Sequence, residues 1–113
     1  IRDYKVTGVQ TCALPIFYSP DIVITTGSTG LSNRDITFDV INELSHKIVP
    51  GIGEFLRMSG SFYSNNSWLS RSLSGIYNKT LIISLAGSPS AVKESLYALG
   101  NLLVHSISVI KEL

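Results

Sequence analysis

Residues 21–35 read Asp-Ile-Val-Ile-Thr-Thr-Gly-Ser-Thr-Gly-Leu-Ser-Asn-Arg-Asp. The β-branched apolar run at residues 21–26 predicts a short strand buried on both faces. Residues 27–35 predict a loop of glycines and hydroxyls that ends in an arginine and a carboxylate. A strand followed by such a loop is typical of a phosphate-binding site with a divalent cation beside it.

A second stretch of the same kind lies at residues 85–90, which read Leu-Ala-Gly-Ser-Pro-Ser. It follows an apolar strand predicted at residues 80–85. Ser88 is the expected N-cap of the next helix, and Pro89 suits its first helical position. Two strand–loop–helix units predict an α/β domain whose ligands bind outside the carboxyl ends of the strands.

The remaining elements follow from periodicity and turn residues. Residues 36–48 predict a helix capped by Thr37, and residues 52–58 a second helix after the break at Pro50-Gly51. Residues 73–85 predict two strands that meet near Asn78. The C-terminal helix is expected to carry an apolar stripe made of Val92, Leu96, Leu99 and Leu103. Three aromatic residues are expected in the core or a subunit interface: Phe62, Tyr63 and Trp68.

Composition excludes several classes of function. The 113 residues are 44% hydrophobic and 15% charged, with a net charge of +1, which is typical of one small globular domain. No basic cluster suggests nucleic-acid binding. No apolar run approaches the roughly 20 residues of a membrane-spanning helix, and no secretory signal is recognisable, so we expect a cytoplasmic protein.

The N-terminal segment differs from the rest. Residues 6–16 read Val-Thr-Gly-Val-Gln-Thr-Cys-Ala-Leu-Pro-Ile and resemble the conceptual translation of a sequencing-library adapter. We therefore expect residues 1–16 to be artefactual or disordered, and residues 17–113 to be a partial domain that is incomplete at its N-terminus. Cys12, the single cysteine, lies in this segment, so no argument about a disulfide or a metal site rests on it.

A series of motifs in order resembles the molybdopterin-binding family of molybdenum cofactor biosynthesis, whose soluble members include adenylyltransferases of the MoaB/Mog type. The family's Thr-Thr-Gly-Gly-Thr-Gly and Arg-Asp-Val-Thr motifs correspond to residues 25–30 and 34–37. Its Pro-Gly-x-x-Glu corresponds to residues 50–54, its Leu-Ser-Arg to residues 69–71, and its Leu-Pro-Gly-Ser-Pro to residues 85–89. The match runs from Asp21 to about His105.

The resemblance implies a three-layer α/β sandwich with a mostly parallel mixed sheet, usually assembled as a homotrimer. It also implies that the phosphate of molybdopterin attacks the α-phosphate of MgATP, which gives adenylylated molybdopterin and pyrophosphate. Asp35 is then the expected catalytic residue and Mg²⁺ ligand. The expected substrate- and phosphate-binding residues are Thr26, Gly27, Ser28, Thr29, Gly30, Glu54, Ser70, Arg71, Gly87, Ser88 and Pro89.

Some positions depart from the family pattern. Ser28 replaces a glycine and tolerates a positive backbone φ less well. The family's second important aspartate lies upstream, and neither Asp3 nor Asp21 matches its context. Two alternatives therefore stay open, a non-catalytic molybdopterin-binding or assembly module and an inactive fragment of the enzyme. The related domain of competence-damage-type proteins fits less well, because those generally lack an arginine at the position of Arg34.

Overall fold

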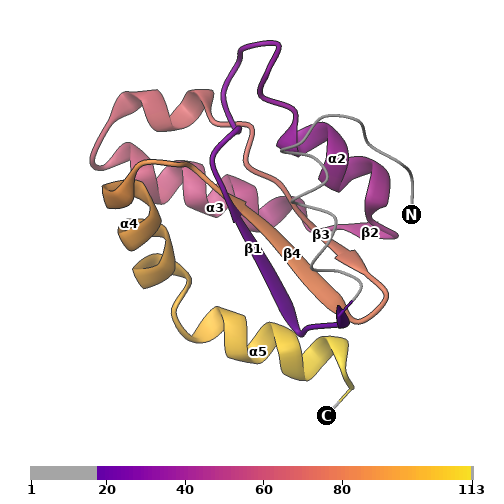
Figure 1. Ribbon diagram of the computed structural model, residues 1–113. Coiled ribbons are helices and arrows are strands. Elements are labelled where there is room, and N and C mark those ends of the chain that lie inside the picture. Colours follow the sequence, from indigo (N-terminus) through magenta and orange to yellow (C-terminus); the bar gives the residue numbers. More distant parts are fainter. Residues whose placement is uncertain (1–17, 113) are drawn as a thin grey trace.

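The computed structural model describes residues 18–112, and within them the chain forms a four-stranded sheet with the order β1-β4-β3-β2 (Figure 1). The strands are β1 (Ile22–Thr26), β2 (Lys47–Ile48), β3 (Ser74–Tyr77) and β4 (Thr80–Leu85). β1 runs parallel to β4, whereas β4 pairs with β3, and β3 with β2, in antiparallel fashion. The mixed sheet confirms the predicted fold class, although parallel pairing has a smaller share in the described residues than we predicted.

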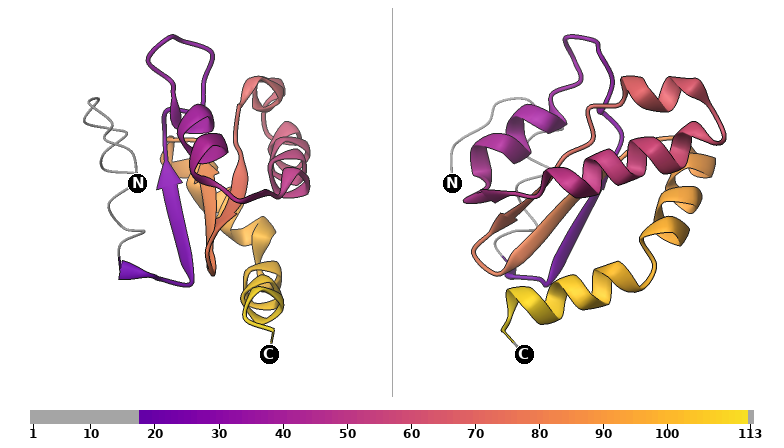
Figure 2. Two further views of the ribbon diagram at one scale, coloured as in Figure 1. Left: turned by 90° about the vertical axis from the view of Figure 1, so that its right-hand side faces the viewer. Right: turned by 180° about the vertical axis from the view of Figure 1, so that it is seen from behind.

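Helices cover both faces of the sheet, which confirms the three-layer arrangement (Figure 2). Helix α2 (Thr37–Leu44) packs on one face. Helices α3 (Pro50–Ser61), α4 (Pro89–Leu99) and α5 (Asn101–Ile110) lie on the other, and the 3₁₀ helix η2 (Asn65–Leu69) follows α3. Within residues 18–112, no helix combines the length and the apolar character that crossing a membrane would require.

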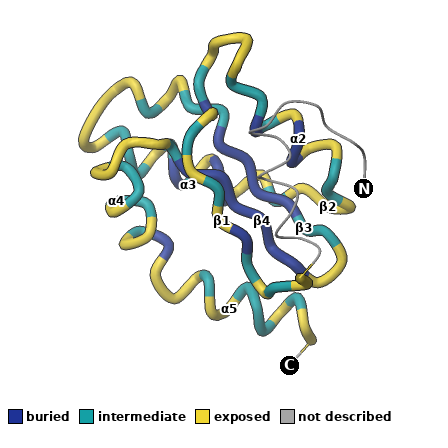
Figure 3. Tube along the Cα trace, viewed as in Figure 1, coloured by how far each residue is buried: buried dark blue, intermediate teal, exposed yellow. Residues whose placement is uncertain are grey.

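The core is centred on β4, in which all six residues are buried (Figure 3). Leu81, Ile83 and Leu85 contribute to the cluster under α3 and α4, whereas Ile82 belongs to the cluster under α2. The sequence of such a strand is almost continuously apolar, because helices cover both of its faces. Full burial of one such side chain contributes about 1.5–3 kcal/mol.

The antiparallel hairpin of β3 and β4 forms as predicted. Asn78 occupies its turn with a φ of 54°, a left-handed conformation that asparagine tolerates better than most residues. The buried hydroxyl groups on the two strands of this hairpin, those of Ser74, Thr80 and Ser84, donate to backbone carbonyls. The Ser84 hydroxyl donates to the Leu73 carbonyl at 3.0 Å and accepts from the Leu73 amide at 2.8 Å.

The prediction that β1 is buried on both faces is wrong. β1 lies at the edge of the sheet within the described residues, and Ile24 remains 39% exposed although Val23 is only 6% exposed. The apolar composition of the strand could not show this, because edge or centre depends on which other strands pair with it.

The helix predicted at residues 36–48 is also shorter than expected. α2 ends at Leu44, where the Ser45 hydroxyl donates to the Ile41 carbonyl at 2.6 Å and Ser45 itself turns to an extended backbone. Lys47 and Ile48 then pair with β3 as the short strand β2. Helix α3 begins earlier than predicted, at Pro50, whose ring suits the first turn.

The predicted C-terminal stripe is divided between two helices. Gly100 has a φ of +42° and separates α4 from α5. Leu99 is buried and Val92 and Leu103 pack beside it, but Leu96 is 40% exposed. Lys111 forms an ion pair with Asp21 at 2.6 Å, which ties the end of α5 to the start of β1.

Candidate functional site

The two loops singled out from the sequence lie side by side, because they follow the adjacent parallel strands β1 and β4. The Gly27 amide donates to the Leu85 carbonyl at 2.8 Å. A Cβ atom added to Gly87 would lie 3.0 Å from the Gly27 Cα. The close approach therefore favours glycine at position 87, and the structure brings the predicted phosphate-binding segments to one edge of the sheet.

The first loop is held in an unusual backbone conformation. Gly27 has a φ of 90° and Ser28 a φ of 57°, so the serine that replaces the family's glycine does occupy the left-handed region. The Arg71 amide donates to the Thr29 carbonyl at 2.7 Å, which anchors the loop to the segment before β3. Thr29 is buried, whereas the Ser28 side chain is exposed.

Thr37 does not cap α2 as predicted. The N-cap residue is Ile36, and no side chain caps this helix. The Thr37 hydroxyl instead donates to the Gly27 carbonyl at 3.4 Å, because the first loop folds back over the start of the helix. The side chain thus stabilises the loop rather than the helix end.

Asp35 closes the far end of this loop. Its carboxylate Oδ2 accepts a hydrogen bond from the Ser32 amide at 3.1 Å, and its own amide donates to the Ser32 carbonyl at 3.0 Å. A Cβ atom at Gly30 would lie 2.7 Å from Oδ2, so glycine at this position leaves the space that the carboxylate occupies. Within residues 18–112, Oδ1 of Asp35 makes no hydrogen bond.

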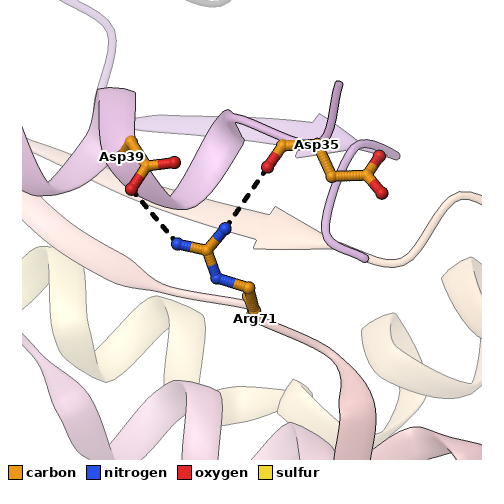
Figure 4. Close-up of polar contacts among 3 residues, drawn as sticks. All are labelled: Asp35, Asp39 and Arg71. Atoms are coloured by element: carbon orange, nitrogen blue, oxygen red, sulfur yellow. Dashed lines mark hydrogen bonds and ion pairs between the residues drawn. The ribbon is translucent and has the colours of Figure 1, made fainter. Parts of the chain in front are cut away.

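Arg71 links the loop to α2 (Figure 4). Its Nη2 donates to Asp39 Oδ1 at 3.1 Å and its Nη1 to the backbone carbonyl of Asp35 at 3.4 Å. The guanidinium carbon lies 4.7 Å from the centroid of the Phe38 ring, a cation–π distance. The Asp35 carboxylate points away from this guanidinium in Figure 4, so it is not neutralised by Arg71.

A cavity of about 1070 Å³ opens beside the two loops, between α3, η2 and α4. Four of the predicted site residues line it: Thr29, Gly30, Ser70 and Ser88. Ser88 also caps α4 as predicted, since its hydroxyl accepts from the Ala91 amide at 3.2 Å. The helix therefore begins at the cavity, where its N-terminus favours an anion.

The other predicted residues do not line this cavity. Asp35 and Arg71 lie beside it on the α2 side of the first loop, and Glu54 is exposed on α3. Of the remaining ones, Gly27, Ser28 and Gly87 belong to the two loops. Thr26 is the last residue of β1 and Pro89 the first residue of α4. Asp21 is engaged by Lys111 at the opposite end of β1, so it does not supply a partner carboxylate for Asp35.

Arg57 lines the cavity from α3 and was not predicted as a site residue from the sequence. Its Nη1 donates to the carbonyls of Ser70 and Ser72, at 3.2 and 2.9 Å. A Cβ atom at Gly53 would lie 2.5 Å from the Ser72 carbonyl oxygen, so glycine there allows α3 to approach this segment. Gly53 and Arg57 are four residues apart and so lie on the same side of α3. This spacing was the feature of the sequence that could have indicated the contact.

The three aromatic residues expected in the core or a subunit interface are not in the core of this chain, and a subunit-interface position stays a prediction. Phe62 is 85% exposed, Tyr63 71% and Trp68 56%. α3 ends at Ser61, and the turn into η2 carries these side chains away from the sheet. Phe62 and Tyr63 line the cavity together with Tyr97 of α4.

The described residues contain no group of three or more His, Cys, Asp or Glu side chains that could hold a metal ion. Mg²⁺ is usually held by one or two carboxylates together with substrate phosphates. The free oxygen of Asp35 beside a phosphate-type loop fits that mode of binding. His46 does not suggest a metal ligand, since its ring stacks on Tyr77 with centroids 5.1 Å apart.

A family model and curated relatives both match most of this chain. Residues 9–105 match the family described as "Probable molybdopterin binding domain". The match begins within residues 1–16, which lie outside the described part of the structure, so their artefactual origin stays a prediction. The chain is 40% identical over 93 residues to the molybdopterin adenylyltransferase of Helicobacter pylori, and 35% identical over 112 residues to that of Escherichia coli. These alignments cover 82% and 95% of this chain, but 53% and 57% of the relatives, so the chain spans little more than half of their length.

Solved structures agree with the sequence matches. The molybdopterin biosynthesis enzyme MoaB from Thermus thermophilus superposes with a TM-score of 0.82 at 34% identity, over 94% of this chain and 67% of that one. A MogA structure gives a TM-score of 0.86 at 32% identity, over 91% and 68%. On the order of its motifs, its fold and these matches, the chain belongs to the molybdopterin-binding domain family of molybdenum cofactor biosynthesis.

Proposed function

We propose that the protein carrying this chain is a molybdopterin adenylyltransferase. In this reaction a phosphate oxygen of molybdopterin attacks the α-phosphorus of ATP, the bond to the β-phosphate oxygen breaks, and pyrophosphate leaves. The observation that carries the proposal is the placement of two glycine- and hydroxyl-rich loops side by side, at the mouth of a cavity large enough for a nucleotide-sized ligand. Names of relatives at 35–40% identity support it.

The loops can bind phosphate mainly through their backbone. Within residues 18–112, the amides of Ser28, Thr29 and Gly30 have no hydrogen-bond acceptor, whereas the Gly27 amide is already bonded to Leu85. Successive unpaired amides around a residue of positive φ form a concave anion site. The N-terminus of α4 adds a second set of amides from the other loop.

Asp35 is our candidate for holding the Mg²⁺ that accompanies ATP. The ion would supply charge neutralisation on the phosphate oxygens. Nucleotidyl transfer needs positioning and charge stabilisation rather than a covalent nucleophile. Arg71 contributes by fixing the backbone of Asp35 and the Thr29 carbonyl, so the carboxylate and the phosphate-binding amides keep one geometry.

The test is ATP-dependent release of pyrophosphate in the presence of molybdopterin, measured on this chain and on a full-length relative with the matching aspartate. Asp35→Asn should lower kcat by about 100-fold or more, because a neutral amide oxygen holds the cation much more weakly than a carboxylate. The control is Asp39→Asn, four residues further along, whose carboxylate is exposed and faces Arg71. Its rate should stay within a few-fold of the original. Full activity of Asp35→Asn would rule out the catalytic assignment.

A second candidate is a non-catalytic molybdopterin-binding or assembly module. It is favoured by the single carboxylate that the described residues place at the loops, since Asp21 is paired elsewhere. Saturable molybdopterin binding by both this chain and the full-length protein, without pyrophosphate release, would favour this alternative. Activity of the full-length relative alone would identify this chain as an inactive fragment of the enzyme.

We also propose a cytoplasmic homotrimer, as in the family that the sequence resembles. The exposed Trp68, Leu69 and Met58 give the α3–η2 surface an apolar character suited to subunit contact. Light scattering of the purified protein should give three times the chain mass. A monodisperse monomer at micromolar concentration would contradict the trimer without affecting the proposed reaction.

A further inference from the structure

The cavity has two chemically different ends. Thr29, Gly30 and Ser88 form the end at the strand termini, where backbone amides and hydroxyls predominate. Phe62, Tyr63 and Tyr97 contribute aromatic rings to the lining from the end of α3 and the middle of α4. A ligand with a phosphate at one end and a flat ring at the other would match both.

The aromatic side chains are unusually exposed for their size. Tyr97 is 90% exposed and Phe62 85%, and neither packs into the two core clusters. An exposed aromatic face in the lining of a cavity gains by stacking on a planar heteroaromatic ring, and each such contact contributes to affinity without requiring a particular ring substituent. Stacking alone does not distinguish a purine from a pterin.

Glu94 supplies that distinction. It lies on α4 one turn before Tyr97, lines the cavity, and is half-buried. Among the described residues it is the one carboxylate in the lining, and it forms no hydrogen bond or ion pair with any of them. Arg57, the cation in the lining, is directed to the carbonyls of Ser70 and Ser72.

A carboxylate accepts hydrogen bonds and donates none, so it selects a ring edge with two parallel N–H donors. The 2-amino-4-oxo pyrimidine edge of a pterin presents such a pair, from its ring N–H and its amino group. Adenine presents one amino group beside a ring nitrogen that is an acceptor, and that nitrogen would face the carboxylate unfavourably. The chemistry of Glu94 thus favours a pterin over adenine.

We propose that Glu94 receives the 2-amino-4-oxo edge of the pterin, with Tyr97, Phe62 and Tyr63 against its ring and the pterin's phosphate directed to Thr29 and Ser88. The inference rests on the proposed function in that it assigns the pterin end of that same site. It assigns specificity to Glu94, a residue outside all the family motifs recognised in the sequence.

The experiment measures the affinity of this chain for neopterin monophosphate, followed by the intrinsic fluorescence of the pterin, and its affinity for ATP by calorimetry. Glu94→Gln should weaken pterin binding by about tenfold or more, because one of the two N–H donors loses its acceptor. Its affinity for ATP should be unchanged. Lys93→Gln, at the neighbouring exposed position, should bind both ligands as the original chain does.

The aromatic contribution is tested with two substitutions at Tyr97. Tyr97→Leu should weaken neopterin monophosphate binding several-fold, whereas Tyr97→Phe retains the ring and should restore it. Circular dichroism of each variant checks that the fold is retained, which is expected because neither Glu94 nor Tyr97 belongs to the two core clusters. GMP, which shares the two-donor edge, should compete with the pterin better than IMP, which lacks the amino group.

Unchanged pterin affinity in Glu94→Gln would overturn the proposal, and so would a loss of ATP affinity with pterin binding intact. Failure of the original chain to bind neopterin monophosphate at millimolar concentration would also overturn it. Glu94-dependent pterin binding without pyrophosphate release would uphold the subsite while rejecting the transferase. Adenylylation of molybdopterin together with a pterin affinity that does not depend on Glu94 would uphold the transferase and reject the Glu94 subsite.

Discussion

The two parallel strands β1 and β4 both end in a glycine- and hydroxyl-rich loop, but they reach that loop in different ways. β4 is buried along its whole length, and a loop of three residues leads directly into a capped helix. β1 lies at the sheet edge, and its loop of ten residues includes a serine with positive φ and leads into a helix without a side-chain cap. The comparison indicates that the buried core fixes the conformation of the loop after β4, whereas the conformation of the loop after β1 depends on contacts from distant segments.

Those distant contacts can be named. The loop after β1 is anchored by the amide of Arg71, by the Thr37 hydroxyl and by the close approach of Gly87. Each of them comes from a different element. The loop after β4 needs little more than the Ser88 cap and the glycine contact. We therefore expect substitutions in the two strand–loop units to have effects on stability and ligand binding that differ in size and in kind.

The largest difference should appear between Ile83 and Ile24, which are paired in register across the two strands. Ile83→Ala should lower the free energy of unfolding by about 3–4 kcal/mol, because the residue is fully buried and a cavity would remain. Ile24→Ala should cost about 1 kcal/mol or less, since 39% of this residue is exposed. Urea unfolding followed by circular dichroism measures both. Equal losses would mean that β1 is as buried as β4.

The contact between the loops is tested at Gly87. Gly87→Ala places a Cβ 3.0 Å from the Gly27 Cα, so one backbone must move. We expect a loss of about 1–3 kcal/mol in stability and weaker ATP binding, since both anion sites shift. The control is Gly51→Ala, where nothing lies within 4 Å of the added Cβ and the helix should gain about 0.5 kcal/mol. A Gly87→Ala chain with unchanged stability and ATP affinity would show that the loops act separately.

The smallest effect concerns backbone strain in the loop after β1. Ser28→Gly should raise the free energy of unfolding by about 1 kcal/mol, because glycine adopts a φ of 57° without steric cost. Asn78→Gly provides the comparison at a φ of 54°, and should gain less because asparagine tolerates this region. Thermal unfolding of the two variants gives the difference. A loss of stability in Ser28→Gly would mean that the serine side chain has a stabilising role of its own.

Predictions from the sequence succeeded where the physical cause is local. The hairpin turn at Asn78, the cap at Ser88 and the proline start of α4 depend on residues a few positions apart, and the structure confirms all three. The family followed from short motifs with a fixed order. The errors at Thr37 and at the end of α2 arose where a residue contacts another segment, since the Thr37 hydroxyl bonds to Gly27 and residues 47–48 pair with β3.

The sequence by itself determined the strand and loop segments, the family, and the residue types available for phosphate binding, because hydrophobic periodicity and turn chemistry act over a few residues. Only the tertiary structure decided that β1 lies at an edge, that Arg57 holds the segment carrying Ser70, and that Glu94 shares a cavity with Phe62 and Tyr97. Arg57 and Ser70 are 13 positions apart, and Phe62 and Glu94 are farther apart still. Their meeting depends on how the helices pack across the sheet, which no local pattern records.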